Sequence, residues 1–163
     1  MLKKSKMIKL FVVSFLIAVI LLYFQYQYIL KQVTSTDGFV KLEVKEILVQ
    51  NEFAIVKLSN KCNEFEFYTT QQQAESIQIG EKNITYFRPT THDIIKSILE
   101  NYEIKPINVK IIKMEEGTYF AEMTFQKGLK FLTVDIRPSD AIAIAVRMKV
   151  PIFVNENLTR KVC

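Results

Sequence analysis

The sequence predicts an α+β fold, with a mixed sheet built from two β-rich repeats and one transmembrane helix in front of it. Three observations lead to this prediction. A long apolar run without charges extends from Leu10 to Leu30. Beyond that run, apolar and polar residues alternate with the period of β-strands. The alternating segments occur twice in the same register, with Leu42 matching Val109 and Ile77 matching Ile144, and each set is followed by a helical stretch.

The N-terminal apolar run has the length of a membrane anchor. Residues 10–30 carry no charged side chain, and a helix of that length spans about 31 Å, enough to cross the hydrocarbon core. A cleaved signal peptide has a similar pattern, but no small-residue cleavage site follows Phe24. We therefore expect an uncleaved signal anchor. The predicted segments are a basic tail at 1–9, the anchor at 10–30, a linker at 31–40 and a domain at 41–163.

The positive charge of the chain lies mostly before this domain. The formal net charge is +5, but Lys3, Lys4, Lys6 and Lys9 precede the anchor and leave 18 basic and 17 acidic residues beyond it. Four lysines on that flank predict a cytoplasmic N-terminus and a domain outside the cytoplasm. A domain of net charge +1 lacks the broad basic surface of phosphate-driven binders, so nucleic acid is a partner only through a local cluster. The oligomeric state is left open, a homo-oligomer included.

Each predicted repeat consists of three strands and a helix. Residues 42–77 fall in gap-free register with residues 109–144, which makes an internal duplication our explanation of the pattern. The repeats should end in helices at about 71–78 and 139–149. The second of these helices has apolar residues on several sides and should be deeply buried.

A third helix is predicted between the repeats, at about 91–103. Thr90 and Asp93 can form a capping box at its start, and Lys105-Pro106 ends it. Pro138 likewise suits the first turn of the last helix. Each of these two helices thus has an Arg-Pro pair at its start, Arg88-Pro89 for the first and Arg137-Pro138 for the second. Free backbone N–H groups at a helix start attract anions.

Several of these segments resemble motifs of the bifunctional nuclease domain family. The run from Asp135 to Arg147, closed by Pro151 to Val154, is similar to the family's C-terminal signature. Arg88 to Ile95 resembles its second motif, and Gly117 to Glu122 its central strand. The resemblance covers roughly residues 42–158. It implies an α+β domain and suggests DNase and RNase activity.

Comparison of the two repeats predicts where the site lies. In register, the charged residues Asp135, Arg137, Asp140 and Arg147 correspond to Tyr68, Thr70, Gln73 and Gly80. A purely structural requirement would be expected in both copies, so we place the site on the second. The family usually has an acidic residue where Gln72 or Gln73 stands, and here the sequence departs from it.

The candidate residues follow from this placement. The predicted catalytic residues are His92, Asp93, Asp135 and Asp140, with His92 as a general base or proton relay. The predicted phosphate-binding residues are Arg88, Arg137, Ser139 and Arg147. The three aspartates, Asp93, Asp135 and Asp140, are the predicted metal ligands, since carboxylate oxygens suit Mg²⁺ or Mn²⁺.

The candidate acids and the histidine also have structural explanations. His92 and Asp93 stand at a helix start, where local hydrogen bonds and capping occupy such residues. Asp140, or Ser139 before it, can cap the last helix.

The candidate arginines leave a similar choice open. Arg137 and Arg147 bind a phosphate if they are free, or lock the turn by salt bridges if they are not. Asp135 can pair with Arg137 or Arg88. Such a network would be structural and not catalytic.

Cys62 and Cys163 carry no metal-site pattern, because neither has a second ligand nearby. A disulfide between them is conceivable outside the cell, but with Cys163 at the last position we expect two unlinked thiols.

The sequence thus favours a membrane-anchored nuclease that hydrolyses phosphodiester bonds of DNA or RNA. Its alternative is a non-catalytic module that binds an anionic ligand or a partner protein at the membrane. No glycine-rich phosphate loop, Ser-His-Asp order or cysteine nucleophile motif occurs, which argues against kinases, nucleotide hydrolases and the common hydrolases.

Overall fold

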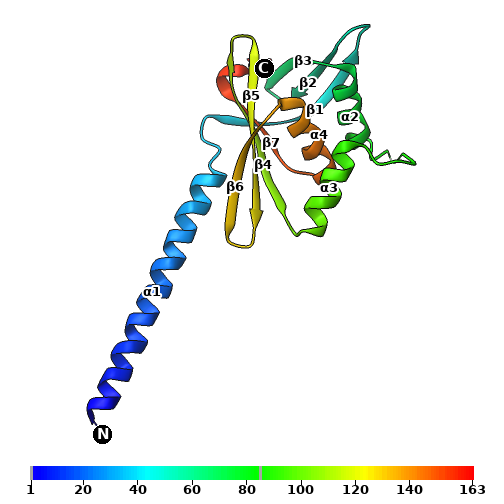
Figure 1. The fold of residues 1–163 in the computed structure, drawn as a ribbon. Helices are drawn as coiled ribbons and strands as arrows, with labels where there is room; N and C mark the ends of the chain where they lie inside the picture. The colour runs from blue at the N-terminus through cyan, green and yellow to red at the C-terminus, as the bar shows by residue number, and fades with distance from the viewer. Residues whose placement is uncertain (1, 85) are drawn as a thin grey trace. The chain divides into compact units, whose positions relative to one another are not determined.

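The computed structural model describes residues 2–84 and 86–163. The chain divides into two compact units, one ending at Ser35 and the other running from Thr36 to Cys163. The elements, labelled in Figure 1, are α1 (Leu2–Thr34), β1 (Phe39–Val49), β2 (Ala54–Ser59), β3 (Asn63–Thr69), α2 (Gln71–Glu81), α3 (Thr91–Asn101), β4 (Lys105–Glu115), β5 (Thr118–Lys127), β6 (Lys130–Ile136), α4 (Pro138–Met148), β7 (Ile152–Asn155), the 3₁₀ helix η1 (Glu156–Leu158) and β8 (Arg160–Lys161).

Helix α1 makes up the first unit. It is the one helix in the described part of the chain that is long and apolar enough to cross a membrane, with a mean hydropathy of 2.6 in its most apolar window. The helix continues beyond residue 30, and Thr34 Oγ1 donates to the Leu30 carbonyl at 2.7 Å. Since β1 begins at Phe39, the segment predicted as a linker at 31–40 is helical at its start and extended at its end.

The second unit contains one mixed sheet, as predicted. Its eight strands lie in the order β6-β5-β4-β7-β1-β2-β3-β8. The β4–β7 pair is parallel, and the other neighbouring pairs are antiparallel. Strand β7 separates the two predicted repeats, β1-β2-β3 on one side and β4-β5-β6 on the other.

The order of three strands and a helix occurs twice along the chain. Strand β6 lies as many residues after β3 in the sequence as helix α4 lies after α2. The offset is the same whether it is counted between the first or between the last residues of the two elements. The common offset agrees with the gap-free register found in the sequence. A common origin of the two halves stays a prediction.

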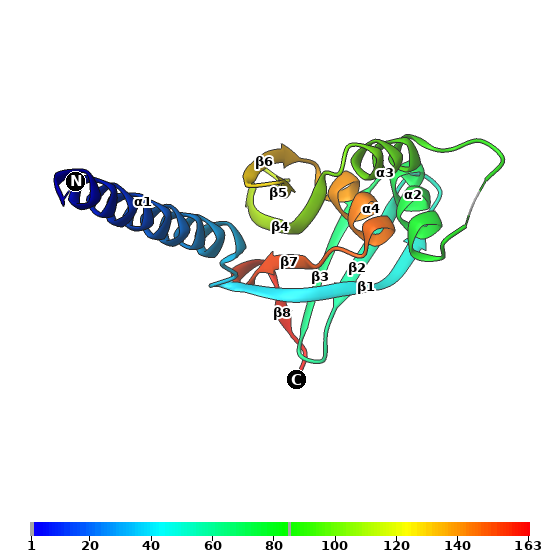
Figure 2. The same cartoon turned by 90° about the horizontal axis from the view of Figure 1, so that it is seen from below.

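Helices α2, α3 and α4 gather on the same side of strands β1–β3 (Figure 2). Their positions confirm the predicted helices, with ends that differ by at most three residues. Helix α4 is deeply buried as expected, because Ala141, Ile142 and Ala143 have no exposed surface. The hydrophobic core cluster runs from Leu42 to Val154, so the second unit has a complete core of its own.

The prediction of two unlinked thiols is wrong. Cys62 and Cys163 form a disulfide with a Cα–Cα distance of 4.8 Å. The short strand β8 pairs with β3, and the Val162 N–H donates to the Cys62 carbonyl at 2.9 Å. This pairing aligns the chain end with the β2–β3 turn, although the two cysteines are 101 positions apart in sequence.

Candidate functional site

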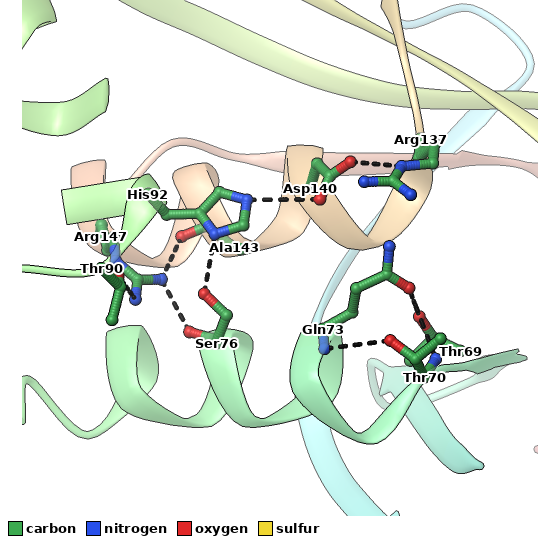
Figure 3. Close-up of polar contacts among 10 residues, drawn as sticks. All are labelled: Thr69, Thr70, Gln73, Ser76, Thr90, His92, Arg137, Asp140, Ala143 and Arg147. Carbon is green, nitrogen blue, oxygen red and sulfur yellow. Dashed lines mark hydrogen bonds and ion pairs between the residues drawn. The ribbon is translucent and has the colours of Figure 1, made fainter. Parts of the chain in front are cut away.

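A cleft of about 590 Å³ lies where α2, α3 and the start of α4 meet. Its polar lining includes Gln73 and Ser76 from α2, His92 from α3, and Arg137 and Asp140 at the start of α4 (Figure 3). Apolar side chains complete the lining, among them Ile79, Ile95, Ile136 and Ile144. We call this the His92 cleft.

The imidazole of His92 lies between Ser76 and Asp140 (Figure 3). Its Nδ1 is 2.8 Å from Ser76 Oγ, and its Nε2 is 3.4 Å from Asp140 Oδ1. An ionised carboxylate can only accept a hydrogen bond, so the neutral ring fits best with its proton on Nε2 and the Ser76 hydroxyl donating to Nδ1. Hydroxyl, imidazole and carboxylate then stand in series.

Burial keeps His92 in its neutral form. The side chain is only 12% exposed. Desolvation lowers the pKa of His92 below its ordinary value of 6.5, and this outweighs the opposing effect of the Asp140 carboxylate. A neutral imidazole at pH 7 is able to accept a proton, which is the property a general base requires.

Asp140 joins His92 to Arg137. Arg137 Nε donates to Asp140 Oδ2 at 2.6 Å, so each carboxylate oxygen faces a different N–H group. The Arg137 side chain is 72% exposed. It therefore stands at the rim of the cleft, where the remaining guanidinium N–H groups are open to a phosphate from solvent.

Arg147 is placed quite differently, deep between α2 and α4. Its side chain is only 3% exposed, and its Nε donates to Asp93 Oδ1 at 2.7 Å. Its Nη1 donates to the carbonyls of Ser76 and Ala143 at 2.7 and 2.8 Å. A guanidinium surrounded by protein acceptors is not open to a phosphate. For Arg147 the structure favours the salt-bridge alternative.

Asp93 is the acidic partner in this buried network. Its Oδ2 accepts hydrogen bonds from the Thr90 backbone N–H at 2.9 Å and from Thr90 Oγ1 at 2.7 Å. Burial opposes the charged form, but the hydrogen bonds from Arg147 and Thr90 prevail and lower the pKa of Asp93 to about 2. The capping box predicted at the start of α3 is present, and Asp93 serves it.

The other predicted site residues lie outside the His92 cleft. Val134 and Ile136 pack against the core, so strand alternation points the Asp135 side chain between them to the opposite face of the sheet. Ser139 is buried in the first turn of α4, and Arg88 is exposed before α3. Neither is among the described residues that line the cleft.

The predicted metal ligands are not brought together. Asp93 binds Arg147, Asp135 faces away, and both oxygens of Asp140 face nitrogen atoms of neighbouring side chains. Within residues 2–84 and 86–163, no three His, Cys, Asp or Glu side chains form a group that could hold a metal ion. We derive no step through a metal, and the use of Mg²⁺ or Mn²⁺ stays a prediction.

Sequence reasoning missed Ser76. In the register of the two repeats, helix α2 has this hydroxyl at the position where α4 has Ala143. The available signal in the sequence was a polar residue on the inward face of α2, at the position where the other repeat has an alanine. Its nearness to His92 depends on how α2 packs beside α3, which no local pattern specifies.

Comparison with known protein families matches most of the second unit to a single family. Residues 57–163 match the model of the bifunctional nuclease domain. Because the match covers more than half of the chain, the protein belongs to this family.

The relatives include proteins named as nucleases. Bifunctional nuclease 2 of Arabidopsis thaliana is 42% identical over 79 residues, which are 47% of this chain and 24% of that protein. Bifunctional nuclease 2 of Oryza sativa subsp. japonica is 40% identical over 82 residues, 47% of this chain and 25% of that protein. An uncharacterised protein of Mycobacterium tuberculosis is 36% identical over 86 residues, 53% of this chain and 51% of that protein. The chain thus matches about half of the bacterial relative and a quarter of the plant proteins.

Proposed function

We propose that the domain hydrolyses phosphodiester bonds of DNA or RNA, with His92 as the proton acceptor. The series of Ser76, His92 and Asp140 beside the exposed Arg137 is the observation that carries this proposal. Membership in the bifunctional nuclease domain family supports the reaction class, as do the relatives named bifunctional nucleases.

In the proposed reaction, the neutral His92 imidazole takes a proton from the attacking oxygen as that oxygen bonds to phosphorus. The ester bond between phosphorus and the leaving oxygen breaks, and the imidazolium returns the proton to the leaving oxygen. Asp140 stabilises the imidazolium in between. Arg137 offers charged N–H groups to the phosphate as negative charge builds on it.

Cleavage of a labelled single-stranded oligonucleotide by the full chain in detergent micelles tests the proposal. His92→Gln should lower the rate by about 10²- to 10⁴-fold, and Asp140→Asn should also lower it. Asp135→Asn is the matched control, since this carboxylate lies on the opposite face, and it should cleave at the wild-type rate. Wild-type cleavage by the His92→Gln variant would overturn the proposal.

Two further arms of the same assay define the chemistry. If the attacking oxygen belongs to Ser76, the phosphoryl group is transferred to the serine, water then breaks the new Oγ–phosphorus bond, and Ser76→Ala abolishes cleavage as fully as His92→Gln does. If the attacking oxygen belongs to water, the loss in Ser76→Ala is smaller. Cleavage in EDTA, compared with added Mg²⁺ or Mn²⁺, determines whether the reaction requires a metal ion.

A binding module without catalysis is the second candidate function. It is favoured by the near-neutral charge beyond the anchor, 18 basic against 17 acidic residues, since a protein of this kind needs only a local anion site. Calorimetry of the full chain with oligonucleotides and polyphosphate separates the two functions. Heat of binding without any cleaved product would favour the module.

We further propose that α1 anchors the domain to a membrane, with the N-terminus in the cytoplasm. The lysines before α1 and its apolar length support this orientation. The Cys62–Cys163 disulfide supports a domain outside the cytosol, because disulfides persist mainly in oxidising compartments.

A tag placed after Cys163 tests this orientation. Protease added to intact cells should digest the tag, and Gln at positions 3, 4, 6 and 9 should give mixed orientations. A tag protected until the cells are opened would contradict the proposed topology. A mature chain shortened at its N-terminus would instead identify α1 as a cleaved signal sequence.

A further inference from the structure

A second cleft adjoins the His92 cleft. It has a volume of about 420 Å³ and shares two lining residues with the first, Gln73 and Arg137. Its other lining residues include Phe53, in the turn before β2, and Tyr68, near the end of β3. Arg137 thus belongs to both clefts, and whatever binds in one lies next to the other.

Phe53 and Tyr68 form an exposed aromatic pair. Their ring centroids are 5.4 Å apart with an interplanar angle of 64°, and the two residues are 37% and 67% exposed. The core does not need these rings, because Phe65 and Phe67 on β3 are each only 3% exposed and already fill it. Exposed aromatic rings in a cleft are the surfaces on which unpaired nucleobases stack.

The charged residues of this cleft favour one orientation of a bound nucleotide. Arg137 is the single basic residue among the described residues that line it, and Glu52 is the single acidic one. A phosphate is attracted to the Arg137 side, where the His92 cleft begins. Glu52 disfavours a phosphate near the aromatic pair and leaves that end to an uncharged base.

We propose that Phe53 and Tyr68 form a base-stacking subsite for single-stranded nucleic acid, next to the scissile phosphate in the His92 cleft. This subsite rests on the proposed nuclease function and names its substrate class. A base within a duplex is stacked on its neighbours and cannot reach the rings without unpairing. The subsite therefore selects single strands or unpaired ends.

The protein has no tryptophan, so Tyr68→Trp creates a single fluorescent reporter at the subsite. The full chain in detergent micelles, with His92→Gln added so that the ligand stays intact, is titrated with a short oligothymidylate. Stacking should quench the fluorescence of the new indole ring. Tyr102→Trp is the matched control, because Tyr102 at the end of α3 is 62% exposed and lies outside both clefts; it should not respond.

Affinity gives an independent readout. Tyr68→Ala should weaken binding of the oligothymidylate by about 5- to 150-fold, the range expected for one lost base–aromatic stack. Tyr102→Ala should bind as tightly as its parent. An abasic oligomer of equal length should neither quench the indole nor distinguish Tyr68→Ala from its parent.

Equal affinity of the parent and Tyr68→Ala for the oligothymidylate would overturn the subsite, and so would equal quenching by the abasic oligomer or no binding at all. Because these measurements read binding and not turnover, their failure is separate from that of the nuclease proposal. A protein that cleaves in a His92-dependent manner without a Tyr68 effect is a nuclease lacking this subsite. A protein that shows the Tyr68 effect without cleavage binds single strands but does not hydrolyse them.

Discussion

Arg137 and Arg147 lie at the two ends of α4, and their surroundings give them different roles. Arg137 is exposed and shares one carboxylate with His92, whereas Arg147 is enclosed by acceptors from three helices. The sequence predicted a phosphate ligand at both positions and left a salt bridge open for each. Burial, which depends on packing between the repeats, separates the two cases.

This difference predicts opposite effects of substitution. Arg147→Met should lower the free energy of unfolding by about 3 kcal/mol or more, because it leaves the Asp93 carboxylate partly buried without its partner. Arg137→Met should change it by less than about 1 kcal/mol, since the pair it breaks is exposed. Urea unfolding of both variants provides the measurement. Equal stability losses would show that burial does not separate the two arginines.

The lowered pKa of His92 predicts how the proposed cleavage depends on pH. Its pKa lies below 6.5 in the folded protein, so the imidazole is neutral and able to accept a proton above that value. Cleavage should therefore fall on the acid side, with a midpoint below 6.5. A pH–rate profile of wild type measures this limb. A midpoint clearly above 6.5 would mean that another group is titrating.

At the scale of elements, the packing of α2 against α4 depends on Gly80. A Cβ atom added there would lie 2.6 Å from Arg147 Nη1 and 2.8 Å from Val146 Cγ2. Gly80 and Arg147 also correspond to each other in the register of the repeats, so equivalent positions of the two repeats meet at this contact. The two carbonyls that accept from Arg147 Nη1, those of Ser76 and Ala143, are equivalent in the same sense.

Because of this contact, replacing Gly80 by alanine should have the opposite effect on stability from the usual replacement of a helical glycine. In an exposed helix, alanine in place of glycine stabilises by about 1 kcal/mol. Gly80→Ala should instead destabilise by about 1–3 kcal/mol, because the added methyl group has to displace Arg147 or Val146. Thermal unfolding measures the change, with Gln72→Ala, at an exposed position of α2, as the control. A stabilised Gly80→Ala variant would show that the two helices separate easily.

The sequence was most informative about these elements and least informative about how they meet. Alternation, a proline at the start of α4 and a capping box before α3 located the helices to within a few residues. Strand alternation also indicates which way the Asp135 side chain points, because Val134 and Ile136 beside it are the core-facing residues. The approach of Ser76 to His92 had no such signal, because it joins two helices whose packing no local pattern specifies.

For the molecule as a whole, the disulfide is the feature that sequence reasoning did not predict. It closes a loop with a sequence separation of 101. Replacing Cys62 and Cys163 by serine should lower the free energy of unfolding by about 2–5 kcal/mol. Urea unfolding of the full chain in micelles measures this, and dithiothreitol should weaken wild type but leave the double variant unchanged. A reductant effect on the double variant would point to a cause other than this bond.

The same bond closes residues 62–163 into a covalent ring, and α1, β1 and β2 precede this ring in the chain. All three helices that line the His92 cleft lie within the ring. One peptide bond cut between α2 and α3 would open the ring without dividing the molecule, since the fragment with Ser76 and the fragment with His92 and Asp140 would stay joined through Cys62 and Cys163. Such a nicked protein would run as one band on a non-reducing gel and separate into two bands only after reduction.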